Sequence, residues 1–202
     1  VRYPDTYEFY RGDELIGEYF ENVKESDFTN DEQSKLKELM DKYRNSRSHI
    51  TNGAAASYYG VSNVGSVIHK CKYENGGDFP EHLVNLLYNA YSKAFKKYQY
   101  DLILYVPPTS SGDLVRHLAE NFRQKANIGI SHGLKKLRET QEQKMFQNDL
   151  TKKKNIEDAF DIDENVKGKK IILIDDIYDS GATVKEISQM LSKKGAKFVT
   201  PL

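Results

Sequence analysis

The stretch that decides the fold is IILIDDIYDSGAT, which runs from Ile171 to Thr183. It opens with a non-alternating apolar run, the pattern of a β-strand that is covered on both faces. Asp175 and Asp176 follow this run, and a turn that contains Gly181 then leads into a helix. Because ligands of open parallel sheets bind beyond the carboxyl ends of the strands, these residues occupy the expected place for a binding site.

The residue types in this stretch suit a ribose bound to a phosphate. Adjacent carboxylates can accept hydrogen bonds from a vicinal diol, and the first N–H groups of a helix attract an anion. Gly181 lets the backbone approach a phosphate closely, while Ser180 and Thr183 add hydroxyl donors. Taken singly, the acids could be solvated turn residues, and Asp179 or Ser180 could merely cap the helix. The ordered string favours the ribose-phosphate interpretation.

Helical and strand patterns alternate on the amino-terminal side of this stretch and beyond it. Periodic apolar residues predict helices from Pro80 to about Tyr98, from about Ser111, and from about Ala182 to Lys194. The side chains expected to face inward in the last two helices are Leu114, Val115, Leu118, Ala119, Phe122, Val184, Ile187 and Leu191. Short apolar runs predict strands at 101–106, 128–130, 159–162, 170–174 and 197–200. This alternation predicts an α/β fold, with a mainly parallel sheet flanked by helices.

The rest of the chain is less regular. Residues 1–52 are expected to form a helical appendage or the tail of a preceding domain, with one helix near Asn30 to Tyr43. The main domain is then expected to span residues 53–202. Within it, residues 53–77 have the composition of short irregular strands and turns. Residues 134–155 are polar and basic, and they are expected to form a long lid or a disordered loop.

Composition narrows the function classes. The 30 basic and 30 acidic residues cancel, so no global field favours direct nucleic-acid binding by this domain. No apolar run approaches the length of a membrane span. The single cysteine, Cys71, excludes an internal disulfide, fits a cytoplasmic protein, and is expected to be an inert core residue. The start at Val1 and the end just after an expected strand suggest a piece of a longer polypeptide.

IILIDDIYDSGAT resembles the phosphoribosyl pyrophosphate signature of type I phosphoribosyltransferases, which have a Rossmann-like fold. The resemblance implies that Asp175 and Asp176 contact the ribose hydroxyls. It assigns the 5-phosphate to Tyr178, Asp179, Ser180, Gly181, Ala182 and Thr183. It also implies Mg²⁺ as the cofactor, bridging ribose and pyrophosphate, with no protein ligand directly assigned. Asp179 is the candidate catalytic residue, either assisting a proton transfer near the base or acting only as a helix cap.

Two further stretches resemble particular branches of this family. Leu134 to Ile162 is similar to the ComF-like branch, and together with Ala54 to Val84 it resembles most closely the carboxyl-terminal phosphoribosyltransferase domain of some RecQ-type DNA helicases. The family pattern places a pyrophosphate-binding loop at Pro108, Thr109 and Ser110. It places a basic lid at Lys135, Lys136, Arg138 and Lys144. Each group has a plain alternative, an ordinary turn and a solvated basic loop respectively.

Two functions remain open from the sequence. The first is an enzyme that displaces pyrophosphate from phosphoribosyl pyrophosphate with Mg²⁺. The second is a non-catalytic regulatory or partner-binding module of a DNA-processing protein, in which a fused RecQ-type ATP-dependent helicase, involved in DNA repair, would lie upstream of Val1. The chain has no G-x-x-x-x-G-K-[ST] motif, so the helicase motor is not in it. After the proline loop only Arg116 stands where ComF-like proteins have a longer basic element.

Overall fold

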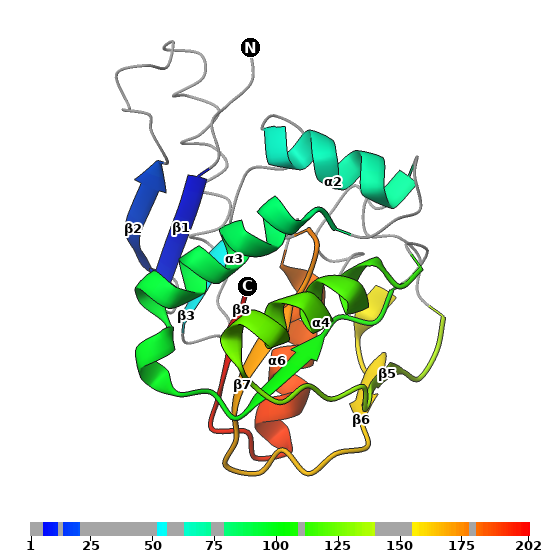
Figure 1. The fold of residues 1–202 in the computed structure, drawn as a ribbon. Helices are drawn as coiled ribbons and strands as arrows, with labels where there is room; N and C mark the ends of the chain where they lie inside the picture. The colour runs from blue at the N-terminus through cyan, green and yellow to red at the C-terminus, as the bar shows by residue number, and fades with distance from the viewer. Residues whose placement is uncertain are drawn as a thin grey trace.

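A parallel three-stranded sheet lies at the centre of the molecule (Figure 1). The structure, a computed structural model, describes residues 6–11, 14–20, 52–55, 63–73, 79–108, 112–139, 155–177 and 181–202. Strand β7 (Lys170–Ile174) pairs in parallel with β4 (Leu102–Tyr105) on one side and with β8 (Phe198–Pro201) on the other. Ile130 adds a parallel bridge to Ile103 at the β4 edge. The predicted parallel sheet is therefore confirmed.

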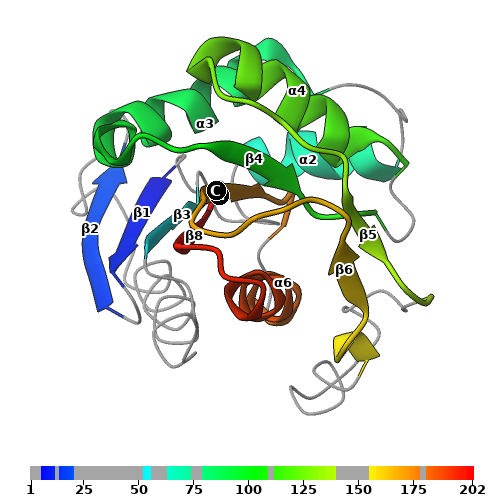
Figure 2. The same ribbon diagram turned by 90° about the horizontal axis from the view of Figure 1, so that it is seen from below.

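Helices cover both faces of this sheet. Figure 2 shows α3 (Glu81–Ala94) and α4 (Leu114–Ala126) on one side of the strands and α6 (Ala182–Lys193) on the other. Alternate residues of β7 serve the two faces: Ile172 and Ile174 pack with α3 and α4, whereas Ile171 and Leu173 pack with α6. Such burial on both faces explains the non-alternating apolar run. The predicted α/β fold class is confirmed.

The amphipathic patterns predicted the helices closely. In α4 the buried side chains are the expected ones, Leu114, Val115, Leu118, Ala119 and Phe122. In α6 the buried residues include the expected Val184, Ile187 and Leu191. The predicted helix from Pro80 to Tyr98 divides into α3 and a short 3₁₀ helix, η2 (Lys96–Tyr98).

A two-stranded antiparallel sheet lies beside the core, formed by β5 (Leu134–Lys136) and β6 (Phe160–Ile162). Strand β6 was expected, but β5 was not, because residues 134–155 were expected to form one long loop. Leu134 is buried against Ile162 and its neighbours, and this pairing fixes the first residues of that segment. The expected strand at 128–130 is reduced to the single bridge at Ile130.

The described part of residues 1–52 forms strands, which were not expected in the predicted helical appendage or domain tail. β1 (Thr6–Arg11) pairs antiparallel with β2 (Glu14–Phe20) and with β3 (Asn52–Ala55). Aromatic residues at Tyr7 and Phe9 favour strand pairing. The helix predicted near residues 30–43 lies outside the described residues. No helix in the described ranges is long and apolar enough to cross a membrane.

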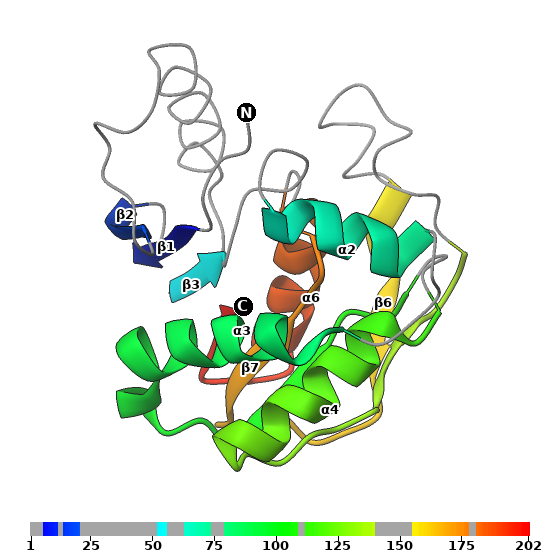
Figure 3. The same ribbon diagram turned by 45° about the horizontal axis from the view of Figure 1, so that its top comes forward.

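The segment from 53 to 77 also differs from its prediction. Besides β3, it contains the helix α2 (Asn63–Tyr73), where only irregular strands and turns were expected. Val64 and Cys71 of α2 are buried in the same core cluster as Ile174. Figures 1 and 3 show α2 beyond α3 and α4, at the end of the sheet where β7 terminates. Its packing therefore brings α2 to the edge at which the candidate site lies.

Candidate functional site

The carboxyl ends of the three parallel strands form one edge. The Val106 N–H donates to the Ile174 carbonyl (2.9 Å), and the Asp175 N–H donates to the Leu202 carbonyl (3.2 Å). These bonds continue the sheet past β7 on both sides and fix where Asp175 and Asp176 emerge. The predicted ribose-binding acids therefore lie at the sheet edge where ligands of open parallel sheets bind.

The two acids face different sides of the sheet edge. Side chains alternate along β7, and continuing that alternation turns Asp176 towards the side of Ile174 and Asp175 towards the opposite side. The contacts agree with this pattern. Lys72 of α2, on the Ile174 side, pairs with Asp176, whereas Lys136 of β5, on the opposite side, interacts electrostatically with Asp175. Two acids and two lysines from three separate segments thus meet at one place.

Asp176 is an enclosed carboxylate. Its Oδ2 lies 2.7 Å from the Lys72 Nζ, and the two side chains are only 6% and 15% exposed. The Asp176 backbone N–H donates to Asp175 Oδ1 (2.9 Å), which fixes the two acids relative to each other. Both acids were expected to face solvent. For Asp176 that expectation is wrong, because α2 covers its side chain.

Asp175 has an unusual electrostatic setting. Burial, followed by the negative charge of Asp176, raises the pKa of the Asp175 carboxyl well above its ordinary value. The nearby Lys72 ammonium opposes that shift. In turn, burial lowers the pKa of the Lys136 ammonium, an effect that the Asp175 carboxylate partly offsets. Perturbed groups gathered at the ligand-binding edge of a sheet are typical of a functional site.

The predicted phosphate-binding turn is described only from Gly181 onward. Gly181 has a left-handed backbone, with φ at 70° and ψ at 6°, and is the residue at which α6 begins. A side chain at this φ would strain the backbone, which accounts for the glycine. Ala182 and Thr183 form the first turn of α6 and are half-buried. The predicted residues Tyr178, Asp179 and Ser180 lie outside the described residues.

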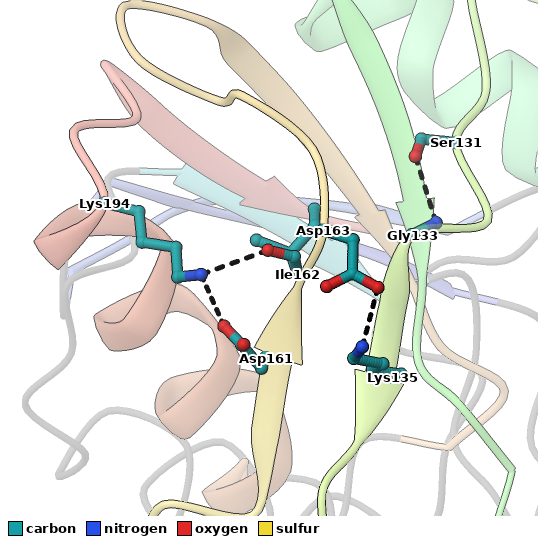
Figure 4. A network of polar contacts seen from close by, with 7 residues as sticks. All are labelled: Ser131, Gly133, Lys135, Asp161, Ile162, Asp163 and Lys194. Carbon is teal, nitrogen blue, oxygen red and sulfur yellow. Dashed lines mark hydrogen bonds and ion pairs between the residues drawn. The ribbon is translucent and has the colours of Figure 1, made fainter.

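The residues predicted for a basic lid separate into different environments. Lys135 forms an ion pair with Asp163 (2.6 Å), as Figure 4 shows. Arg138 donates to the backbone carbonyls of Asn155 (3.0 Å) and Glu157 (2.7 Å). Lys135 and Lys136 belong to β5, a strand, so their prediction as loop residues was wrong. Of these described cations, Lys136 is the one placed beside the acid pair, and Lys144 lies outside the described residues.

The network in Figure 4 shows how Lys135 pairs with an acid beside the neighbouring strand. Alternation along β5 separates it from Lys136, and its partner Asp163 follows β6 directly. On the other side of β6, Lys194, which directly follows α6, pairs with Asp161 and donates to the Ile162 carbonyl (3.0 Å). These exposed pairs join β5, β6 and α6. They contribute to local structure, and they leave Lys136 as the β5 lysine whose pKa the Asp175 carboxylate affects.

The predicted pyrophosphate loop is only partly described. Pro108 is exposed just beyond β4, at the same edge as the acids, whereas Thr109 and Ser110 lie outside the described residues. Arg116, the basic residue after this loop, pairs with Asp113 (2.7 Å), which directly precedes its helix, and with Glu120 (3.6 Å) on that helix. Its charge therefore already has two acidic partners.

Sequence reasoning missed Lys72. The signal was present in weak form: Val64, Val67, Ile68 and Cys71 follow helical spacing, although Gly65 and the β-branched residues are poor helix formers. Within the described ranges, no group of three or more His, Cys, Asp or Glu side chains could hold a metal ion. The acid pair therefore offers no ready-made metal cage in that part of the chain.

Residues 111–200 match the family model for the phosphoribosyl transferase domain. The matched segment contains β7, both acids, Gly181 and Lys136, whereas Lys72 lies before it. The parallel sheet flanked by helices fits the α/β fold of type I phosphoribosyltransferases.

A short stretch is also similar to a curated protein. It is 38% identical over 48 residues to the DNA utilization protein YhgH of Escherichia coli K12 and of Shigella flexneri. The alignment covers 24% of this chain and 21% of YhgH, so it spans only a small part of that protein.

Three solved structures show partial similarity. A hypoxanthine phosphoribosyltransferase from Staphylococcus aureus has a TM-score of 0.42 at 15% identity, covering 60% of this chain and 61% of that one. A phosphoribosylpyrophosphate synthetase from Mycobacterium smegmatis has a TM-score of 0.40 at 24% identity, covering 58% and 31%. A glutamine phosphoribosylpyrophosphate amidotransferase from B. subtilis, complexed with ADP and GMP, has a TM-score of 0.37 at 23% identity, covering 51% and 22%.

Proposed function

We propose that this chain binds phosphoribosyl pyrophosphate, or a related ribose 5-phosphate, at the carboxyl edge of the parallel sheet. The observation that supports this most strongly is one ordered arrangement: a buried strand ends in Asp175 and Asp176, and the left-handed Gly181 begins a helix shortly after. The acids would accept hydrogen bonds from the ribose hydroxyls. The 5-phosphate would bind at the start of α6, with Tyr178 to Thr183 around it.

Mg²⁺ would enter with the ligand. Mg²⁺ is commonly bound through one or two carboxylates together with substrate phosphates and water, so a cluster of protein ligands is not required. Asp175 and Asp176 offer carboxylate oxygens, the donor type that Mg²⁺ prefers, at the sheet edge where the ligand would bind. When bound, the ion would neutralise charge on the pyrophosphate. This chain would orient the sugar through its acids and surround the anion with cations.

In the catalytic version of this proposal, a nucleophile attacks the sugar and pyrophosphate leaves. Negative charge develops on the departing group, and a nearby ammonium stabilises it. Lys136 is half-buried beside Asp175 and is suited to that role, and we assign Lys144 the same role. Pro108, Thr109 and Ser110 would contact the pyrophosphate. Asp179 would assist a proton transfer at the accepting group or cap α6.

A second candidate is a binding module that does not turn its ligand over. The observation in its favour is that Lys135, Arg138 and Arg116 are engaged by groups of the fold and so are less available to pyrophosphate. The similarity to a DNA utilization protein suits a module of a DNA-processing protein. We propose the carboxyl-terminal part of a RecQ-type helicase as its context. An independent start codon directly upstream of the Val1 codon would contradict that fusion.

Calorimetric titration tests the shared part of both candidates. Wild-type protein is titrated with phosphoribosyl pyrophosphate and Mg²⁺, alongside Asp175→Asn and the matched control Asp163→Asn, an exposed acid in the Lys135 ion pair. The wild type and the control should bind, and Asp175→Asn should bind at least about tenfold more weakly. No binding by the wild type would contradict the proposed function. A pyrophosphate assay would then separate the two candidates. Release of pyrophosphate in the presence of a base or amine would indicate the enzyme, and binding without release would indicate the module.

A further inference from the structure

Lys72 is a cation that the α2 helix brings to the sugar site from outside the segment that matches the family model. Its Nζ is 2.7 Å from Asp176 Oδ2, and both side chains are largely removed from water. An exposed ion pair gains little, because water screens it, whereas a buried partner strongly affects the charge it faces. The Lys72 contact therefore belongs to the class of ion pairs that can control the chemistry of an acid.

The position of Lys72 is determined by the core. Cys71, its neighbour in the chain, is buried, and so is Val64 two turns earlier. Both residues belong to the hydrophobic cluster that contains Ile172 and Ile174 of β7. The strand that presents Asp176 and the helix that presents Lys72 thus pack into one cluster. The distance between the two charged groups is consequently set by packing as well as by their attraction.

Charged groups of both signs lie at the acid pair. In the described part of the chain they include Lys72 from α2, which pairs with Asp176, and Lys136 from β5, whose pKa the Asp175 carboxylate affects. Two adjacent carboxylates that lack a cation repel each other, and one of them tends to take up a proton. A protonated acid is a poorer acceptor for sugar hydroxyls than a carboxylate, whose two oxygens offer about four acceptor positions. A cation on one oxygen leaves acceptor capacity for a ligand.

We propose that Lys72 is a positioning residue of the sugar site, whose ammonium holds Asp176 as an oriented carboxylate that accepts hydrogen bonds from the ribose hydroxyls. This inference rests on the proposed function, because it assigns a residue to the same site. It makes α2 part of the ligand-binding apparatus. Lys72 acts through Asp176, so its removal alters how the acid pair responds to pH.

The test compares Lys72→Met and Lys72→Arg with the wild type, by titration with Mg²⁺ and phosphoribosyl pyrophosphate. Lys70→Met is the matched control, because Lys70 is an exposed lysine of the same helix. At about pH 7, Lys72→Met should bind at least about tenfold more weakly than the wild type, while Lys72→Arg and Lys70→Met stay within about threefold. Thermal melting verifies that each variant is folded; should Lys72→Met be unfolded at the assay temperature, Lys72→Gln replaces it.

Two further readouts separate positioning from a structural role. Between about pH 7 and about pH 9, above the second phosphate ionisation near 6, Lys72→Met should regain affinity relative to the wild type as the acid pair loses its shared proton. In an Asp176→Asn background, Lys72→Met should have little additional effect. The inference would be overturned if Lys72→Met lost the same affinity at every pH, or if the effects of Lys72→Met and Asp176→Asn on affinity added in full.

Other outcomes separate this inference from the proposal on which it rests. If the wild type binds and Lys72→Met binds equally well or more tightly, Lys72 is not a positioning residue, although the sugar site stands. If the wild type does not bind at all, the proposed function itself is contradicted, and the role of Lys72 is overturned with it.

Discussion

Asp175 and Asp176 are neighbours in the chain, yet their charged partners differ. The Lys72 ammonium, on α2, lies 2.7 Å from Asp176. Burial, followed by the Asp176 charge, raises the pKa of Asp175, and the Asp175 carboxylate affects the pKa of Lys136 in β5. Sites that separate two acids in this way often give them different roles. A motif of two identical residues can thus hold one acid in a direct ion pair and one acid whose pKa is raised by burial and by its neighbour.

The largest effect on stability should come from breaking the ion pair between Lys72 and Asp176. Asp176→Asn leaves the Lys72 ammonium largely buried without its carboxylate, and such a loss costs about 3 kcal/mol in the free energy of unfolding. Urea denaturation measures this cost. The double variant Lys72→Met with Asp176→Asn should recover part of it, because no charge is then left unpaired. Equal destabilisation by Asp175→Asn and Asp176→Asn would contradict the difference between the two acids.

A smaller effect, on ligand binding, is expected from replacing Lys136, whose pKa the Asp175 carboxylate affects. Lys136→Met removes the cation beside that acid and should weaken binding of phosphoribosyl pyrophosphate about tenfold, or about 1.4 kcal/mol. Lys135→Met, one residue earlier, is the control, because Lys135 pairs with Asp163 instead. Calorimetric titration of both variants makes the comparison. Similar losses in the two variants would show that general positive charge matters more than position.

Asp175→Asn should change stability in the opposite direction from Asp176→Asn. The raised pKa means that the folded state holds the Asp175 proton to a higher pH than the unfolded chain does. The contribution of Asp175 to wild-type stability therefore has its full value below the ordinary carboxyl pKa. It is lost as pH rises through the pKa that Asp175 has in the folded state. The asparagine variant escapes this loss, with a gain of about 1 kcal/mol at neutral pH. Denaturation at several pH values should show the gain disappearing in acid; a gain that is constant with pH would refute the assignment.

The smallest effect is expected far from the acids. Asp163→Asn breaks an exposed ion pair with Lys135, and surface pairs of this kind contribute little. The melting temperature should change by less than about 2 °C. Calorimetric melting measures it, and a drop comparable to that of Asp176→Asn would mean that the β5–β6 network stabilises the fold more than its exposure suggests.

Local sequence patterns predicted the helices and strands in which the buried residues recur at regular spacing. Phe122 and Ile187 lie in helices with a clear apolar stripe, and both are fully buried as expected. The run around Ile172 predicted a strand covered on both faces, because each residue is buried by a different layer. The two acids at the end of that strand are therefore recognisable as a candidate site from the local sequence pattern alone.

The parts that were missed depend on contacts between distant segments. Helix α2 contains Gly65 and Ser66, which are weak helix formers, and its burial against β7 outweighs their propensities. The Lys72–Asp176 pair joins residues that no local pattern connects. Strand β5 is only three residues long, and its pairing with β6 distinguishes Lys135 from Lys136. Each of these features requires the folded arrangement.

The most direct measurement of the central claim is a crystal structure of the protein with phosphoribosyl pyrophosphate and Mg²⁺. We expect sugar hydroxyls within hydrogen-bond distance of the Asp175 and Asp176 carboxylates, and the 5-phosphate against the backbone at Gly181, which precedes α6. A ligand that occupies another part of the surface, or whose phosphate lies away from α6, would contradict it.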